Sequence, residues 1–268
     1  MNKKKITSVV DKITGGSGKK FDTGLVLSGG AARGFAHAGV IKALNEHSIE
    51  PDIVSGVSAG SIVGSFYCDG FEPEEIFEIF EKNKIFEFVK LIFKKHGLLN
   101  ISGLKKVLKK NLRTERIENL PKPLVITATN IEEARTTYFT EGNLVDLVLA
   151  SSSIPVLFSP AKINGLTYVD GGVTNNFPLE PLENKCKELI GVHVNPIGSY
   201  DPNRGLLHMA LNAFHLSIAS GIEFKREKLD YFIEPEKLID FTYYDVKRGR
   251  EMFDIGYAKA IEVLLKQK

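Results

Sequence analysis

The feature that most constrains the fold of this chain is the stretch Asp52-Ile-Val-Ser-Gly-Val-Ser-Ala-Gly-Ser61. A short, β-branched apolar run ends in Gly56-Val-Ser58-Ala-Gly60, and a helix-compatible segment, residues 61–68, follows directly. Strand, G-x-S-x-G and helix in this order are typical of a nucleophile elbow. Because neighbouring backbones nearly touch in such a turn, only Gly or Ala is expected at positions 56 and 60. Ser58 is therefore predicted to stand on a strained corner at a helix N-terminus, where unpaired N–H groups stabilise negative charge.

A second glycine-rich turn precedes the elbow by one structural unit. Residues 24–28 form a short apolar run, predicted as a buried parallel strand, and a helical pattern covers residues 35–47. Together with the elbow strand they make one βαβ unit, which crosses over with right-handed geometry. Residues 29–34 and the elbow should then lie at the C-terminal edge of neighbouring parallel strands, where open α/β sheets bind ligands.

Two kinds of binding loop can be excluded for residues 29–34, Gly-Gly-Ala-Ala-Arg-Gly. The loop lacks the G-x-G-x-x-G spacing and the distal acidic residue of a dinucleotide site, and it lacks the G-K-[ST] ending of a P-loop. Successive small residues at Gly29, Gly30 and Ala31 suit an oxyanion loop, whose N–H groups point one way. A tight turn without a ligand is the alternative, and the nearby serine elbow favours the oxyanion interpretation.

Asp170-Gly171-Gly172 supplies a candidate acid or base. Asp and Gly are also favoured in ordinary β-turns. Here Asp170 ends an apolar, strand-like run, and the two glycines leave its carboxylate uncovered. Asn175 and Asn176 follow as neutral donors able to orient it. A carboxylate beside a serine can act as a general base, particularly where its environment raises its pKa.

Four motifs, in order and spacing, resemble those of a bacterial patatin-like phospholipase. They are Ser28-Gly-Gly-Ala-Ala-Arg-Gly34, Gly56-Val-Ser-Ala-Gly60, Ala150-Ser-Ser-Ser-Ile-Pro155 through Phe158-Ser-Pro160, and Asp170-Gly-Gly172 with Asn175-Asn-Phe-Pro178.

The resemblance implies an α/β fold, a three-layer αβα sandwich with a mainly parallel central sheet. It also implies a Ser58–Asp170 dyad in place of a triad, and an oxyanion hole formed by residues 29–34. One departure is Ala31, where the family loop usually has a third glycine. An alanine held there at positive φ costs on the order of 1 kcal/mol.

Other parts of the chain are predicted by periodicity and turn residues. A hairpin turn is expected at Gly165. The further predicted elements are helices over residues 73–95, 102–110, 144–151, 206–227 and 250–265, and strands over residues 124–129, 136–140, 166–169 and 189–194.

Composition places few further limits on the fold and function of this chain. The 268 residues are 43% hydrophobic and carry a net charge of +2, which suits one large domain and gives no sign of nucleic-acid binding. Lysines and glycines crowd the start, so residues 1–20 are predicted as a flexible basic arm and residues 21–268 as one hydrolase domain. The apolar run after the first lysines is too short for a signal peptide, and no run approaches a membrane span.

Partners, cofactors and location follow from the same features. Two isolated cysteines, Cys68 and Cys186, indicate neither a disulfide framework nor a zinc site, so we expect a cytoplasmic protein without metal or cofactor. A phospholipid or another lipid ester is the expected substrate. Phe and Lys residues over 76–95 suit peripheral contact with the inner membrane face, although packing in the core or in a cap is favoured over it.

Several residues, and the function itself, have more than one interpretation. Arg33 is expected to hold its loop, to attract an anionic head group or to form a structural ion pair, and His37 to pack within its helix. An α/β-hydrolase with a Ser-Asp-His triad would take His193, His208 or His215 as base. That fold usually places several strands before the nucleophile, whereas one precedes the elbow strand here. A non-catalytic lipid- or nucleotide-binding module is the remaining alternative.

Overall fold

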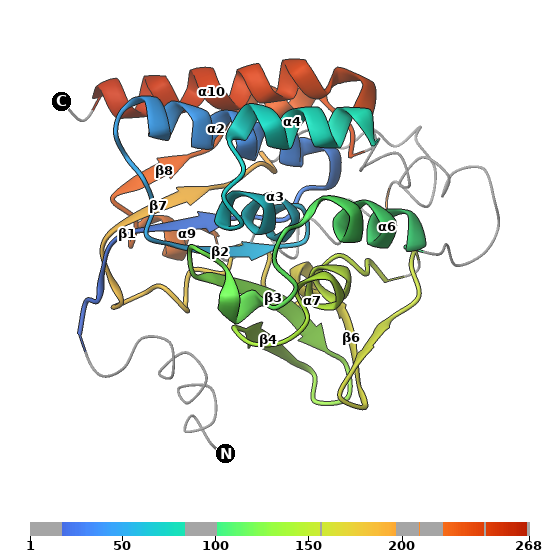
Figure 1. The fold of residues 1–268 in the computed structure, drawn as a ribbon. Coiled ribbons are helices and arrows are strands. Elements are labelled where there is room, and N and C mark those ends of the chain that lie inside the picture. Colours follow the sequence, from blue (N-terminus) through green and yellow to red (C-terminus); the bar gives the residue numbers. More distant parts are fainter. Residues whose placement is uncertain are drawn as a thin grey trace.

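A computed structural model describes residues 18–83, 101–155, 157–196, 209, 222–243 and 245–266. Within this part of the chain, a central eight-stranded sheet has the order β5-β6-β3-β2-β1-β7-β8, and β4 pairs with β3 (Figure 1). The pairs β1–β2, β1–β7, β2–β3 and β7–β8 are parallel. The pairs β3–β4, β3–β6 and β5–β6 are antiparallel. The strands are β1 Phe21–Leu27, β2 Ile53–Val57, β3 Leu124–Asn130, β4 Arg135–Phe139, β5 Ala161–Ile163, β6 Leu166–Asp170, β7 Cys186–Val192 and β8 Tyr231–Ile233.

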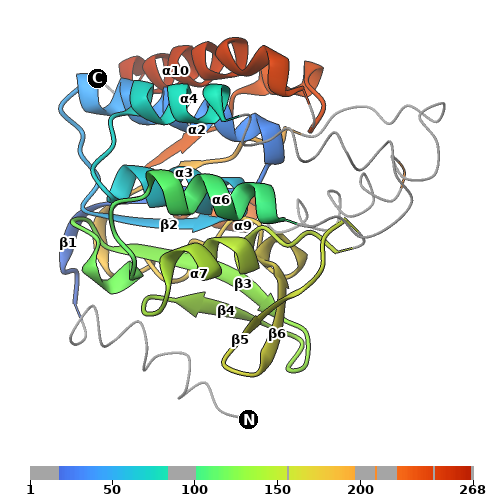
Figure 2. The same cartoon turned by 45° about the vertical axis from the view of Figure 1, so that its right-hand side comes forward.

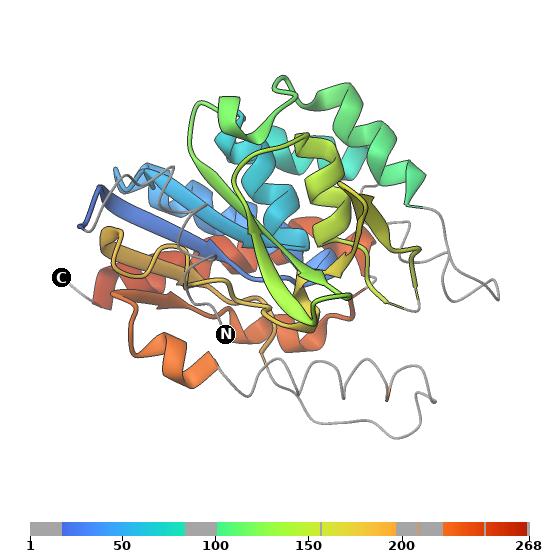
Figure 3. The same cartoon turned by 90° about the horizontal axis from the view of Figure 1, so that it is seen from below.

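Helices cover both faces of the sheet, which makes a three-layer α/β/α sandwich. Strand residues alternate between the two faces: Leu25 and Leu27 belong to one apolar core, whereas Val26 between them belongs to the other. The larger core is covered by α2, α3, α4, α6, α7 and α10, seen together in Figure 2. The smaller core contains Ile222 at the start of α9, which lies on the opposite side of the strands from α3 and α6 in Figure 3. The helices are α2 Phe35–Glu46, α3 Ala59–Cys68, α4 Pro73–Lys82, α6 Ser102–Asn111, α7 Leu144–Ser151, α9 Ile222–Arg226 and α10 Gly249–Lys266.

Two glycines bring α2 and α10 into backbone contact over the larger core (Figure 1). A Cβ atom on Gly39 of α2 would lie 1.9 Å from the carbonyl oxygen of Phe253, and one on Gly256 of α10 would lie 2.2 Å from that of Ala36. Real Cβ atoms do not approach backbone oxygens this closely, so both positions require glycine. The close crossing lets α10 cover the helix that follows the glycine-rich loop.

The register of β3 explains why two distant parts of the sequence meet. On one edge of β3, Val57 at the end of β2 pairs with Thr127, and Asp170 at the end of β6 pairs with the next residue, Ala128. Strand β2 runs parallel to β3 and β6 runs antiparallel to it, so the C-terminal ends of β2 and β6 face each other. The residue after Val57 is Ser58, which therefore lies next to Asp170.

Most of the elements predicted from the sequence are present. The predicted strands before each glycine-rich turn are β1 and β2, which are parallel neighbours as expected. Strands over 124–129, 136–140, 166–169 and 189–194 correspond to β3, β4, β6 and β7, and the hairpin at Gly165 joins β5 to β6. The sequence did not predict β5 or β8. Of the predicted helix over 206–227, the structure describes residue 209 and α9, and the remainder lies outside the described residues.

The aromatic face of the predicted helix over residues 73–95 belongs to the core in the part that is described. Phe77 and Phe80 of α4 pack against the Phe35 ring, with ring centroids 5.6 and 6.1 Å apart. Ile76 and Phe80 are completely buried. Core packing is therefore confirmed for α4, whereas residues 84–95 lie outside the described part, as do residues 1–17 of the predicted arm. No helix among the described residues is both long enough and apolar enough to cross a bilayer.

Candidate active site

Ser58 stands on the predicted sharp turn between β2 and α3. Its φ of 51° and ψ of −121° lie outside the regions that side-chain-bearing residues normally adopt, which costs on the order of 1–3 kcal/mol. A Cβ atom on Gly60 would lie 2.3 Å from the Leu27 carbonyl oxygen, and one on Gly56 would lie 2.6 Å from the Gly60 carbonyl oxygen. Alanine, which the sequence leaves open at both positions, is therefore excluded, because Gly60 packs against the backbone of β1 and Gly56 packs against the backbone of Gly60.

The hydroxyl of Ser58 donates a hydrogen bond to the carboxylate of Asp170. The distance from Ser58 Oγ to Asp170 Oδ2 is 2.6 Å, as expected for a charge-assisted hydrogen bond between a hydroxyl and a carboxylate oxygen. The other carboxylate oxygen, Oδ1, accepts from the Gly172 N–H at 2.7 Å. Ser58 is 8% exposed and Asp170 is 3% exposed, so the pair is nearly closed off from water.

Burial changes the acidity of Asp170. Removal from water raises the pKa of this carboxyl to about 6, against the opposing effect of the hydrogen bonds from Ser58 and the Gly172 amide. A carboxylate with this pKa is a stronger proton acceptor than an exposed one, yet it remains ionised at neutral pH. The pair thus consists of a serine hydroxyl and a base whose proton affinity is raised.

The Asp170-Gly171-Gly172 turn is held tightly against the sheet. A Cβ atom on Gly171 would lie 2.4 Å from the Thr127 carbonyl oxygen, so glycine is required there. The Thr129 hydroxyl donates to the backbone carbonyl of Asp170 at 3.0 Å. The turn and β3 therefore fix the position of the carboxylate from the backbone side.

The end of α7 contacts both members of the pair, which the sequence analysis did not predict. The Ser151 hydroxyl accepts from the Ser58 N–H at 2.8 Å and donates to the Thr127 carbonyl at 2.7 Å. The Ser153 carbonyl accepts from the Asp170 N–H at 2.9 Å. The motif spanning residues 150–155 was noticed in the sequence, but nothing in it indicated which groups its serines contact.

The glycine-rich loop (residues 29–34) passes beside the elbow. A Cβ atom on Gly29 would lie 3.2 Å from the Cβ atom of Ser58. The Gly29 N–H donates to the Asn176 carbonyl at 3.2 Å, so it is already engaged. Within the described part of the chain, the N–H groups of Gly30 and Ala31 have no acceptor. These two amides are the candidate oxyanion donors, rather than the three that were expected.

Backbone angles at Ala31 and Gly34 and the hydrogen bonds of Arg33 describe the conformation of this loop. Ala31 has a φ of 48°, so the absent third glycine falls at a position that favours glycine, at a cost of about 1 kcal/mol. Gly34 has an ordinary helical φ of −56° at the start of α2. Arg33 is buried and donates through Nη2 and Nε to the Phe241 carbonyl at 2.7 and 3.1 Å. Arg33 therefore holds the loop, and its partner is a backbone carbonyl instead of an acidic side chain.

The histidines in the described part of the chain do not contact the pair. His37 is fully buried in α2, and its Nε2 lies 2.8 Å from the Ser28 carbonyl, to which it must donate. Burial lowers the pKa of His37 to about 4, so it is neutral and acts as a packing residue. His193 Nδ1 lies 2.7 Å from Glu234 Oε1. His208 and His215 lie outside the described residues.

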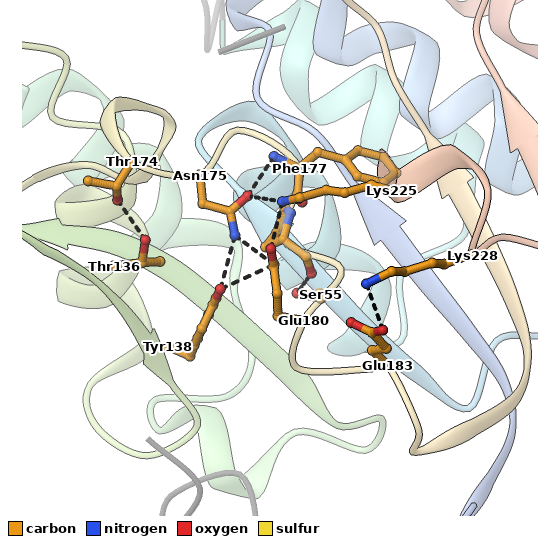
Figure 4. A network of polar contacts seen from close by, with 11 residues as sticks. Ser55, Thr136, Tyr138, Thr174, Asn175, Phe177, Glu180, Glu183, Lys225 and Lys228 are labelled. Atoms are coloured by element: carbon orange, nitrogen blue, oxygen red, sulfur yellow. Dashed lines mark hydrogen bonds and ion pairs between the residues drawn. The ribbon is translucent and has the colours of Figure 1, made fainter. Parts of the chain in front are cut away.

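Asn175 does not orient Asp170 as expected, because its side chain belongs to a separate network (Figure 4). Its amide nitrogen donates to Glu180 at 2.7 Å and to the Tyr138 hydroxyl at 3.0 Å. Its amide oxygen accepts from Lys225 Nζ at 2.7 Å and from the Phe177 N–H at 3.2 Å. Since Lys225 belongs to α9, this network attaches α9 to the segment that follows the Asp170 turn.

Comparison with known sequences identifies the family to which this chain belongs. The sequence model of the patatin-like phospholipase family matches residues 25–183, more than half of the chain. The chain therefore belongs to the patatin-like phospholipase family. This assignment excludes the α/β-hydrolase fold that was considered as an alternative.

Similar sequences occur in a virus, in fungi and in mycobacteria. The chain is 28% identical over 218 residues to the uncharacterised protein R571 of Acanthamoeba polyphaga mimivirus, which covers 73% of each chain. It is 31% identical over 186 residues to the lysophospholipase NTE1 of Kluyveromyces lactis, which covers 67% of this chain and 13% of the relative. The chain thus spans only a small part of that lysophospholipase. Because relatives occur in a virus and in fungi as well as in mycobacteria, the narrower resemblance to bacterial members is not confirmed.

A solved structure supports the fold. The crystal structure of VipD from Legionella pneumophila aligns with a TM-score of 0.54 and 16% sequence identity, over 93% of this chain and 68% of that one. At this identity the likeness concerns the fold alone. It extends beyond residues 25–183, since it includes most of the C-terminal part of the chain.

Proposed function

We propose that this protein is a serine acyl hydrolase that cleaves lipid esters, with Ser58 as nucleophile and Asp170 as general base. The observation that carries the proposal is the 2.6 Å hydrogen bond from Ser58 Oγ to a buried Asp170 carboxylate. The family and the lysophospholipase relative support a phospholipid or lysophospholipid as substrate.

The reaction would begin with attack of Ser58 Oγ on the ester carbonyl carbon. As the new C–O bond forms, the serine proton moves to Asp170 Oδ2, so the alkoxide need not exist before attack. The carbonyl oxygen gains the negative charge, which the N–H groups of Gly30 and Ala31 and the N-terminus of α3 would stabilise. Asp170 then returns its proton to the departing alcohol as the C–O bond of the ester breaks.

The acyl-enzyme would be hydrolysed by the same groups. Asp170 takes a proton from a water molecule while the water oxygen attacks the acyl carbon. Collapse of the second tetrahedral intermediate releases the fatty acid, and Asp170 returns the proton to Ser58. No histidine is required at any step, because one carboxylate with a pKa of about 6 accepts and returns each proton.

A panel of phospholipids and lysophospholipids, with fatty-acid release followed by mass spectrometry, tests this proposal. We expect turnover by the wild-type protein, and loss of at least about 10³-fold in kcat for Ser58→Ala and Asp170→Asn. The variant His193→Asn should keep most of the wild-type kcat. Turnover that persists in Ser58→Ala would exclude the proposed nucleophile, and a panel without any substrate would favour a non-catalytic binding module.

A further inference from the structure

The Asn195 side chain attaches the glycine-rich loop to the segment that follows β7. Asn195 follows the end of β7, is 7% exposed, and donates from Nδ2 to the Gly29 carbonyl at 2.6 Å. Because a carbonyl oxygen can only accept, this contact fixes which end of the Asn195 amide faces Gly29. The Ser28 hydroxyl reaches the same carbonyl at a longer distance, 3.0 Å.

Holding the Gly29 carbonyl also sets the direction of the Gly30 N–H. The two groups belong to one planar peptide unit, and none of the peptide bonds described is cis. In a trans peptide the carbonyl and the N–H point in opposite directions. Asn195 therefore pulls the carbonyl toward β7 and leaves the Gly30 N–H aimed away from it, without an acceptor in the described part of the chain.

The Ala31 N–H, the second candidate donor, is held differently. The Gly30 carbonyl, which shares a peptide unit with the Ala31 N–H, accepts from the Arg33 N–H at 3.0 Å. That bond lies within the loop and cannot fix the loop relative to the sheet. Asn195 can fix the loop relative to the sheet, because it closely follows β7. Strand β7 pairs with β1 up to Val192 and Leu27, just before the loop.

We propose that Asn195 is a positioning residue for the oxyanion hole: its amide orients the Gly29–Gly30 peptide so that the Gly30 N–H faces the substrate carbonyl. The proposal rests on the proposed hydrolase function. Asn195 makes no hydrogen bond with Ser58 or Asp170, and it lies beyond the residues matched by the family model. Its effect on the reaction passes entirely through the loop backbone.

A matched pair of substitutions separates this role from a structural one. Asn175 is the same residue type with nearly equal exposure, 8%, and it makes more hydrogen bonds than Asn195, but none to the loop or the Ser58–Asp170 pair. We would compare Asn195→Ala and Asn175→Ala by kcat and KM on a lysophospholipid and by thermal unfolding. Complete loss of an oxyanion donor lowers kcat by about 10²–10³-fold. Since Ser28 still contacts the Gly29 carbonyl, we expect a loss of at least about tenfold in Asn195→Ala, with little change in KM.

The expected result is a kcat for Asn195→Ala at least about fivefold below that of Asn175→Ala, although Asn175→Ala loses as much thermal stability. The acid limb of the pH profile should not move, because Asp170 is untouched. A smaller difference between the two variants overturns the proposal. If Asn195→Ala does not fold, Asn195→Asp, which keeps the size but removes the donor when ionised, is held to the same criterion. Ser58→Ala is measured in parallel, and turnover in that variant would instead reject the proposed function itself.

Discussion

At the level of single residues, the candidate site combines conformations and charges that are costly in an ordinary protein interior. Ser58 and Ala31 both have positive φ, and Asp170 carries a carboxyl group that is 3% exposed. Strained and desolvated groups persist where the surrounding structure holds them in place. Here the close packing of the elbow on β1 and the hydrogen bonds at the end of α7 hold them.

The raised pKa of Asp170 predicts how activity depends on pH. The base must be ionised to accept the Ser58 proton, so kcat/KM should fall as pH drops through about 6 and stay level above it. This fall in kcat/KM at acid pH, the acid limb of the profile, should also be present in the His193→Asn variant. Its measurement requires a soluble ester substrate, so that changes in lipid aggregation do not contribute. An acid limb that disappears in His193→Asn would contradict a carboxylate base.

The same shift predicts an effect on stability. Because the folded pKa, about 6, lies above the unfolded value of 3.8, the contribution of Asp170 to stability is fully present below pH 3.8 and is lost as pH rises through 6. Asp170→Asn removes the buried charge and should raise the free energy of unfolding at pH 8, by at most about 3 kcal/mol. The gain should vanish near pH 4. Urea unfolding at both pH values checks this, and a variant destabilised equally at both would contradict the buried, ionised carboxylate.

Ser58 and Asp170 were predictable from the sequence because each stands in a local motif. A side chain on Gly60 would clash with the backbone of β1, and one on Gly171 would clash with the backbone of β3, so the need for glycine shows in the sequence. Asn195 and Ser151 were not predictable. Each contacts the candidate site through one hydrogen bond to a residue more than 90 positions away, and neither stands in a sequence pattern that reveals its partner.

Among the elements, α7 connects the two halves of the candidate site. Its last residue, Ser151, holds the elbow through the Ser58 N–H, and Ser153 just beyond holds the Asp170 N–H. These two contacts set the spacing between nucleophile and base from one rigid helix end. The neighbouring Ser152 is also buried, at 5% exposed against 0% for Ser151, but its hydroxyl has no hydrogen-bond partner among the described residues.

Adjacent serines therefore provide a controlled comparison. Ser151→Ala leaves the Ser58 N–H and the Thr127 carbonyl unsatisfied, which should cost about 1–3 kcal/mol in the free energy of unfolding and lower kcat. Ser152→Ala removes a hydroxyl that makes no hydrogen bond, so its cost should be below about 1 kcal/mol with kcat retained. Chemical denaturation and steady-state kinetics check both variants. Equal effects in the two would contradict the role of α7.

The predicted and missed elements differ in length and in the strength of their pattern. Strands β1, β2, β3 and β7 are apolar on both faces, as expected for buried parallel strands, and were predicted. Strands β5 and β8 have three residues each and lie at the ends of the sheet. Such short segments exist through pairing with a neighbour rather than through their own sequence, which is why they were missed.

For the whole molecule, one sheet edge brings together the three separate segments that form the proposed hydrolytic site. Three segments lie at this edge: the loop after β1, the elbow after β2 and the turn after β6. Pairing with β3 and the hydrogen bond from the end of α7 fix their relative positions. The chain belongs to a family of lipid hydrolases, and its site geometry agrees with that chemistry. The proposed site can be tested without knowledge of the natural lipid.

The most direct measurement is covalent labelling by an active-site-directed fluorophosphonate, followed by intact-mass analysis and peptide mapping. The proposed site predicts one adduct per chain, located on Ser58, and no adduct in Ser58→Ala. In Asp170→Asn the labelling rate should fall by at least about 10²-fold, because the serine proton has lost its acceptor. An adduct on another serine, or labelling of Asp170→Asn at the wild-type rate, would contradict the Ser58–Asp170 dyad.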